Sequence, residues 1–247
     1  MTKERLKLNC DMGESFGSWS KGLDEDVMPW VDMANIACGF HASDPDVMSK
    51  TLKLAKSHSV KVGAHPGYHD LIGFGRRTIP MTQDQIVHSI VYQVGALKSL
   101  ASLNDVHLDY IKPHGALYND MMQNESVFIG VLAAAENFSL PVMILASSDN
   151  TRYLDLADQF NVPLLFEAFA DRAYQDSGLL VPRSQPNAVH HKEEDIFYQV
   201  IQLAKYGSIT SENGNAIQIE ADTVCVHGDN PESIAMVQRI AQGLQSL

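Results

Sequence analysis

Residues 110–115 read Tyr-Ile-Lys-Pro-His-Gly, an apolar run that ends in Lys112, His114 and a glycine. The same pattern recurs along the chain, where short apolar segments are followed by longer segments with helical periodicity. This alternation predicts repeated strand–helix units and a parallel sheet. We predict strands at residues 6–11, 33–38, 61–65, 110–114, 142–145, 164–168 and 223–228. Seven such strands favour an α/β barrel in which one strand is missing or irregular.

Length and composition narrow the class of protein. The 247 residues, 45% of them hydrophobic, are enough to bury one sizeable core, so we expect a single domain over residues 1–247. A formal charge of −12 without a Lys or Arg cluster argues against nucleic acid and membrane partners. No run of 18 apolar residues occurs and the N-terminus is charged, so we expect a cytoplasmic protein. Three cysteines without framework spacing indicate reduced thiols.

Helix and loop signals separate the predicted strands. Thr82 and Gln85 form a capping box at the start of one helix. An apolar stripe follows at spacings of three and four residues, formed by Ile86, Ile90, Val94 and Leu97. Residues 173–188 contain two prolines and a glycine and predict a long loop, whereas Gly214 and Asn215 predict a hairpin turn.

Nearly every predicted strand ends in polar, titratable or Gly-rich residues. Carboxyl-terminal strand ends form the active face of parallel barrels, so we expect these residues to share one polar basin. Side chains alternate along a strand, and this alternation directs a subset of them inward. That inward subset is Asp11, His65, Lys112, His114 and His227. The same alternation turns Cys10 and Cys38 toward the helices.

Each of these residues also has a structural alternative. His65 and His114 close apolar strands, where a buried imidazole needs a partner, and we interpret both as site residues. Asp11 needs a cation, a metal or a hydrogen-bond donor, and an ion pair with Lys112 is the structural alternative for both. Asp11, His65 and His114 also offer ligands suited to Zn²⁺ or another first-row ion, although no metal-binding motif accompanies them.

Residues 73–77, Gly-Phe-Gly-Arg-Arg, follow the third predicted strand. We interpret them either as a mobile lid whose arginines, Arg76 among them, contact an anionic substrate or as a solvated loop. The chain has no G-x-x-x-x-G-K-[ST] P-loop and no G-x-G-x-x-G that opens a helix. Nucleotide binding by this chain alone is therefore not supported.

The strand-end motifs are similar to those of a known family. They read LNCDMGE at 8–14, ANIACGFH at 34–41, GAHPGY at 63–68, KPHGALYN at 112–119, FADRAY at 169–174, VPRS at 181–184 and VHGD at 226–229. Over almost the whole chain this ordered set resembles the LamB/YcsF family. One departure is Ser43, where the family pattern leads us to expect Gly.

The resemblance implies a fold, an activity and partners. The fold is an irregular seven-stranded TIM-like barrel of the glycoside hydrolase/deacetylase type. The activity is ATP-dependent hydrolysis of the lactam 5-oxo-L-proline to L-glutamate, with ATP and Mg²⁺ as cofactors. The partners are two further oxoprolinase subunits, B and C. A missing P-loop is compatible with nucleotide binding by the partners or at a shared interface.

These observations together define the predicted site. The predicted catalytic residues, which act on water or stabilise developing charge, are Asp11, Lys112, His114 and Glu167. The predicted substrate-binding and orienting residues are Asn9, Asn35, His41, His65, Arg76, Asp171, Arg172, His227 and Asp229. Two alternatives stay open: a stand-alone metal-dependent amidohydrolase or deacetylase, and a non-catalytic subunit that holds a ligand for partner enzymes.

Overall fold

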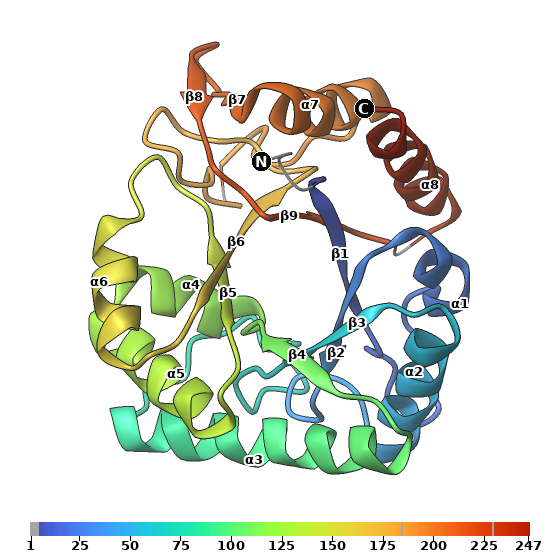
Figure 1. Ribbon diagram of the computed structural model, residues 1–247, viewed down its shortest axis with the longest axis vertical. Helices are drawn as coiled ribbons and strands as arrows, with labels where there is room; N and C mark the ends of the chain where they lie inside the picture. The colour runs from blue at the N-terminus through green and yellow to red at the C-terminus, as the bar shows by residue number, and fades with distance from the viewer. Residues whose placement is uncertain (1–4, 184, 229) are drawn as a thin grey trace.

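A closed barrel of seven parallel strands forms the centre of the molecule (Figure 1). The structure is a computed structural model that describes residues 5–183, 185–228 and 230–247. The barrel strands are, in order, β1 (Lys7–Met12), β2 (Met33–Ala37), β3 (Lys61–His65), β4 (Leu108–Ile111), β5 (Val142–Leu145), β6 (Leu164–Phe169) and β9 (Thr223–Val226). Strand β9 pairs with both β6 and β1 and so closes the barrel. The predicted seven-stranded α/β barrel is confirmed.

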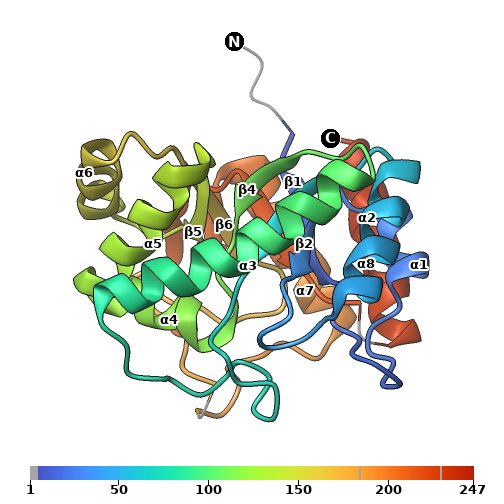
Figure 2. The same cartoon turned by 90° about the horizontal axis from the view of Figure 1, so that it is seen from below.

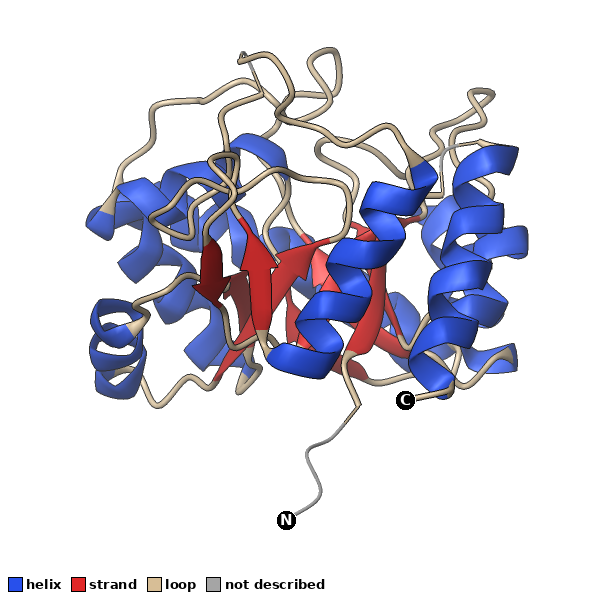
Figure 3. Cartoon of the chain, turned by 90° about the horizontal axis from the view of Figure 1, so that it is seen from above, coloured by secondary structure: helices blue, strands red, loops and turns tan. Residues whose placement is uncertain are grey.

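Helices surround the barrel, as Figure 1 shows. They are α1 (Asp24–Val27), the 3₁₀-helix η1 (Met28–Trp30), α2 (Pro45–Ser57), α3 (Gln83–Leu103), α4 (Gly115–Gln123), α5 (Glu125–Phe138), α6 (Thr151–Gln159), α7 (Glu193–Tyr206) and α8 (Pro231–Gln245). A small antiparallel hairpin, β7 (Ser208–Thr210) and β8 (Ala216–Gln218), follows α7. The long loops gather at one end of the barrel, the upper edge of Figure 3. The residues that follow the strands are thereby brought together.

Helix α3 is long and apolar enough to cross a membrane by length and composition alone, with a mean hydropathy of 1.2 over its best window. It begins with the predicted capping box of Thr82 and Gln85. Its apolar stripe, including Ile90 and Leu97, is buried in the main hydrophobic core. Figure 2 shows α3 lying along the side of the barrel between α2 and α5. Packing on the barrel therefore accounts for its apolar residues.

The interior of the barrel is apolar toward the amino ends of the strands and polar toward their carboxyl ends. Met33, Tyr110 and Met143 form a small apolar cluster in the apolar part. Gly63 makes room for this layer, because a Cβ atom at that position would lie 2.1 Å from the Tyr110 ring. A cavity of about 360 Å³ lies at this end, lined in part by Met33 and Tyr110, and therefore far from the carboxyl-terminal strand ends.

The fourth strand and the following segment differ from the prediction. The strand ends at Ile111, and His114 occupies the N-cap position of helix α4, which the sequence did not predict. Pro113 has no amide hydrogen, and Gly115 adopts a left-handed φ of +55° that favours glycine. The chain therefore turns from strand to helix within Lys112–Gly115.

Ser43 also adopts a left-handed backbone, with φ of +76°. Glycine adopts this conformation without steric cost, which agrees with the glycine expected at this position from the resemblance.

Candidate active site

A buried ion cluster occupies the upper part of the barrel. The Lys112 ammonium, 3% exposed, lies 3.0 Å from Glu167 Oε2 and 3.2 Å from Asp11 Oδ1. It also donates to Asn9 Oδ1 at 3.1 Å and lies 3.4 Å from Cys225 Sγ. One cation thus serves two carboxylates that come from different strands of the barrel. Glu167 is fully buried, whereas the Asp11 side chain is 20% exposed, so Asp11 is the carboxylate that faces the open end.

Side-chain amides hold this cluster in place. The Asn35 amide donates to Asn9 Oδ1 at 2.8 Å and to Asp11 Oδ1 at 2.9 Å. The Tyr110 hydroxyl donates to Asn35 Oδ1 at 2.6 Å, which fixes the orientation of that amide. Asn9 in turn donates to Glu167 Oε2 at 3.3 Å. Asn9 and Asn35 are both fully buried, and their contacts orient the charged groups.

Charge and burial set the ionisation of the cluster. Burial alone would lower the pKa of Lys112, but Asp11, Cys225 and Glu167 together raise it well above its ordinary value. Burial also raises the pKa of Asp11, yet the electrostatic effect of neighbouring His65 and Lys112 outweighs it and holds that pKa well below the usual range. At neutral pH, Lys112 is therefore a cation and Asp11 an anion.

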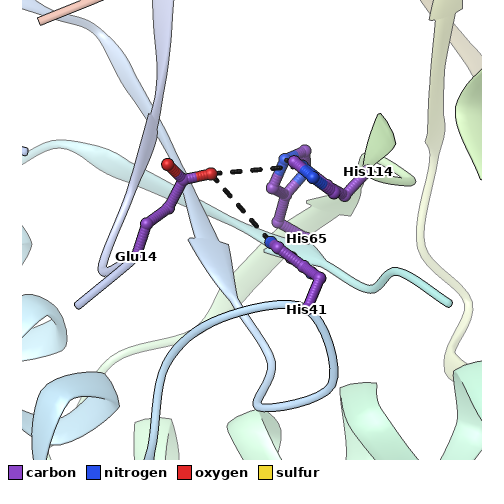
Figure 4. Close-up of side chains that lie close together, drawn as sticks. All are labelled: Glu14, His41, His65 and His114. Atoms are coloured by element: carbon purple, nitrogen blue, oxygen red, sulfur yellow. Dashed lines mark hydrogen bonds and ion pairs between the residues drawn. The ribbon is translucent and has the colours of Figure 1, made fainter. Parts of the chain in front are cut away.

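Three histidines and Glu14 lie close together (Figure 4), and His65 Nε2 lies 3.4 Å from Asp11 Oδ2. His114 Nδ1 lies 2.9 Å from His65 Nε2, and the rings of His41 and His114 stack at 3.7 Å between centroids with planes 3° apart. Glu14 Oε1 lies 4.0 Å from both His41 Nε2 and His114 Nδ1. One ligand atom from each of the four residues lies within 4.8 Å of the others, a grouping that can hold a metal ion.

Burial governs the protonation of this group. Burial, followed by the electrostatic effect of neighbouring His65, lowers the pKa of His114 to about 3. Burial also lowers the pKa of His41 well below its usual value, and it raises the pKa of Glu14. Neither ring nitrogen of His41 has a hydrogen-bond partner within the described part of the chain, although the residue is fully buried. Such an unsatisfied group is costly unless a ligand completes the site.

The loop of residues 68–80, here named the cover loop, lies over the histidines. His114 Nε2 lies 2.8 Å from the carbonyl oxygen of Phe74, and the Ala116 amide donates to the carbonyl of Gly75 at 2.9 Å. The Lys21 ammonium lies 3.5 Å from the Phe74 ring centroid. The cavity that touches Asp11 and Glu14 measures about 10 Å³, no more than one water molecule. Entry of a substrate at this point therefore requires loop movement.

The other predicted binding residues lie at the rim, meaning the open end of the barrel, or away from the site. Asp171 Oδ2 and His227 Nδ1 are 3.2 Å apart and both side chains are partly exposed. Arg76 is exposed on the cover loop. Arg172 is buried and donates to the carbonyls of Ala188 and Val181, so it holds the 173–188 loop and a contact with substrate is not expected. Asp229 lies outside the described residues.

Comparisons with known proteins fit this arrangement. Residues 6–247 match the model of the LamB/YcsF family. The chain belongs to the LamB/YcsF family. It is 64% identical to a protein from Vibrio vulnificus (strain YJ016) that is named as the A subunit of 5-oxoprolinase, over 100% of both chains. It is 52% identical to a protein of the same name from Pseudomonas fluorescens (strain Pf0-1), over 97% of each. A crystal structure of a lactam utilization protein from Thermus thermophilus superposes with a TM-score of 0.92 at 33% identity, covering 98% of this chain and 97% of that one.

Within this LamB/YcsF chain, sequence reasoning missed several residues of the site. Glu14 and Lys21 form an ion pair at 2.6 Å beside the histidines. Tyr118 is buried next to Glu167, and burial together with that carboxylate raises the pKa of Tyr118. The signal for Tyr118 was present, since it follows His114 by four residues and so shares one helix face. Glu14 and Lys21 lie in a loop whose path the sequence does not reveal.

The metal candidates from the sequence are only partly grouped as predicted. His65 and His114 are adjacent, but Glu14 and His41 join them in one possible ligand group. Asp11 belongs to a second group with Cys225 and His227, although its Oδ2 also lies 3.4 Å from His65 Nε2. Loop positions decide this difference, because Glu14 and His41 both follow the strands that carry Asp11 and Asn35.

Proposed function

We propose that this chain is the A subunit of a 5-oxoprolinase that opens the lactam of 5-oxo-L-proline to L-glutamate. The names of its full-length relatives support this role. The geometric observation that carries the proposal is the pairing of an ionised, partly exposed Asp11 with the Lys112 ammonium at 3.2 Å. Opening a lactam requires a nucleophilic water and stabilisation of charge on the amide oxygen, and these two groups have the chemistry for both.

The proposed roles follow from exposure. Asp11 faces the open end and orients water or accepts its proton. Lys112 stabilises negative charge on the amide or phosphoryl oxygen. Glu167 is fully buried, so it positions Lys112 and does not meet substrate. Arg76 and the Asp171–His227 pair at the rim bind the polar groups of the substrate.

ATP, Mg²⁺ and subunits B and C complete the proposed reaction. Amide resonance protects the five-membered lactam, and phosphorylation of its oxygen by ATP would give a reactive electrophile. The LamB/YcsF chain has no P-loop, so the nucleotide is bound by a partner or at an interface shared with one. A cytoplasmic location is part of the proposal, since ATP is the driving reactant.

The test is glutamate formation from 5-oxoproline by the purified chain, with and without ATP, Mg²⁺ and the two partner subunits. Glutamate is expected only in the full mixture. The Asp11→Asn variant, which keeps the shape of the side chain, should lower turnover by about 10²-fold or more. Equal glutamate formation by a mixture without this chain would refute the proposal.

A second function is favoured by the histidine cluster. The approach of His65 Nε2 and His114 Nδ1 to 2.9 Å suits a stand-alone metal-dependent amidohydrolase. That function predicts amide hydrolysis by the isolated chain without ATP, and loss of this activity with a chelator. Dependence on ATP and on the partner subunits would rule it out.

A further inference from the structure

The hydrogen bonds of His65 and His114 leave their facing nitrogens without a hydrogen to share. His65 Nδ1 lies 2.7 Å from the carbonyl oxygen of Lys112, and His114 Nε2 lies 2.8 Å from that of Phe74. A carbonyl oxygen only accepts, so each of these nitrogens must carry the ring hydrogen. In neutral rings, His65 Nε2 and His114 Nδ1 are then both lone-pair acceptors, yet they lie 2.9 Å apart. A positive centre between them is required.

The charges around His65 and His114 also favour a bound cation. Among the described residues of the lysine and histidine clusters, the three carboxylates of Asp11, Glu14 and Glu167 are accompanied by two ammonium groups. Lys112 pairs with Asp11 and Glu167, and Lys21 pairs with Glu14. With the histidines neutral, these described groups carry one net negative charge in a largely buried region, where an uncompensated charge is costly. A bound cation would offset it.

We propose that His65 Nε2, His114 Nδ1 and Asp11 Oδ2 bind one divalent first-row transition-metal ion of the zinc class. Ligand atoms about 2.0–2.1 Å from a tetrahedral ion are about 3.3 Å apart. The observed separations are 2.9 Å between the nitrogens and 3.4 Å from His65 Nε2 to Asp11 Oδ2. Three protein ligands leave one position open, and Glu14 Oε1 lies 4.0 Å from His114 Nδ1. This inference does not depend on the lactam chemistry.

His41 is excluded as a ligand by its orientation. An imidazole nitrogen binds a metal in the plane of its ring. The planes of His41 and His114 are parallel within 3°, with centroids 3.7 Å apart, so the two rings cannot both direct a nitrogen at one ion about 2 Å away. His41 instead covers one face of His114. Its two buried nitrogens have no hydrogen-bond partner among the described residues, and the proposed ion does not supply one.

The cover loop completes the ion site. The carbonyl of Phe74 holds the hydrogen of His114 on Nε2 and so directs the lone pair of Nδ1 toward the ion. Gly75 packs against the same ring, because a Cβ there would lie 2.8 Å from His114 Cδ2 and 2.7 Å from His41 Cβ. Ion binding is therefore linked to the closed position of residues 68–80.

Titration of the chelator-treated full chain with Co²⁺, followed by visible absorption, and with Zn²⁺, followed by calorimetry, tests the proposal. We expect one ion per chain. His65→Gln and His114→Gln should each weaken binding by at least about 100-fold, whereas His41→Phe, which keeps the stacked ring, should change it by less than about threefold. Circular dichroism verifies that each variant is folded. If His114→Gln fails to fold, His65→Gln alone decides.

Two outcomes would overturn the assignment. The wild-type chain binding no ion at stoichiometric level would refute the site, and a nitrogen-15 spectrum would then show a proton shared by the two rings. Loss of binding in His41→Phe would mean that the ion is bound by the group of Glu14, His41, His65 and His114 instead.

The link to the cover loop has its own test. Gly75→Ala should weaken ion binding about 10-fold or more, while Gly214→Ala, with a similar positive φ but no neighbour within 4 Å, should not. Equal effects of both would refute the link to the cover loop. All of these results are independent of whether 5-oxoproline is hydrolysed.

Discussion

At the scale of single residues, Lys112 holds two carboxylates together and is also the group proposed to stabilise charge in the reaction. Its ammonium is the partner of Asp11 and of the fully buried Glu167. Lys112→Met would leave two carboxylates close together without their cation. We expect loss of turnover and a decrease of about 3–5 kcal/mol in the free energy of unfolding, measured by urea denaturation.

A double-mutant cycle separates the charge from the packing. In Lys112→Met/Glu167→Gln the second change removes one of the stranded charges and keeps the side-chain shape. The double variant should therefore be more stable than Lys112→Met alone, by about 1–3 kcal/mol. Additive losses in the two single variants would contradict a direct ionic coupling between Lys112 and Glu167.

The predicted inward residues do converge, because parallel strands deliver their carboxyl ends to one face. The alternation of side chains along β1 and at the end of β4 correctly predicted that Asp11 lies near Lys112. It also predicted Cys10 in the core against the helices. The same reasoning could not find Glu14, nor the exact stacking of His41 on His114. Those positions depend on loop paths, for which the chain offers no periodic pattern. Arg172 shows the converse, since proximity to a strand end did not reveal its carbonyl partners.

At the scale of elements, Gly63 in β3 is a test of how tightly the barrel interior is filled. An added Cβ would lie 2.1 Å from Tyr110 Cε2, and displacing that ring would break its 2.6 Å hydrogen bond to Asn35. Gly63→Ala should therefore lower the free energy of unfolding by about 1–3 kcal/mol or more.

The matched control is Gly95→Ala in α3, where no atom lies within 4 Å of the added carbon. Because alanine is the better helix former, this change should stabilise the chain by about 0.5–1 kcal/mol. Denaturant unfolding of both variants makes the comparison. Equal effects would mean that the barrel interior can expand around position 63.

The cover loop is fixed by an ion pair that should respond to acid. Hydrogen bonds from Arg77 lower the pKa of Asp70 to about 2, and Asp70 also accepts from the Gly73 amide at 2.9 Å. An unfolded Asp has a pKa of about 3.9. Since the folded pKa is the lower one, the stabilisation is present above about pH 4 and is lost as the pH falls toward about 2.

The difference in melting temperature between wild type and Asp70→Asn, measured from about pH 2 to about pH 6, checks this linkage. It should be largest above about pH 5 and shrink in acid. Arg77→Gln should remove most of the pH dependence of that difference. A difference that grows in acid would contradict the sign of the pKa shift.

At the scale of the whole molecule, the fold was predictable to the level of its barrel strands. Each apolar run between helical segments became a barrel strand, and the boundaries of β3 and β5 agree with the prediction. Helix α4 was missed because its residues, Gly115–Gln123, directly follow the strand-end motif, and the predicted strand includes Pro113 and His114. Closure of the sheet by β9 against β1 is a tertiary result of strand number and tilt, which no local pattern encodes.

The proposed ion site should stabilise the whole barrel. Its ligands come from β1, from the end of β3 and from the N-cap of α4, so the unfolded chain has no preformed site and binding adds to the free energy of unfolding. At free Zn²⁺ of about 100 times the dissociation constant, the gain is about 2.7 kcal/mol. For a chain of this size, that corresponds to a rise in melting temperature of about 5–10 °C.

Differential scanning calorimetry with Zn²⁺ and after chelation measures this rise in melting temperature. The rise should persist in His41→Phe and vanish in His65→Gln. Mg²⁺, which prefers oxygen ligands, should not reproduce it, and an equal rise in His65→Gln would place the stabilising ion elsewhere on the chain.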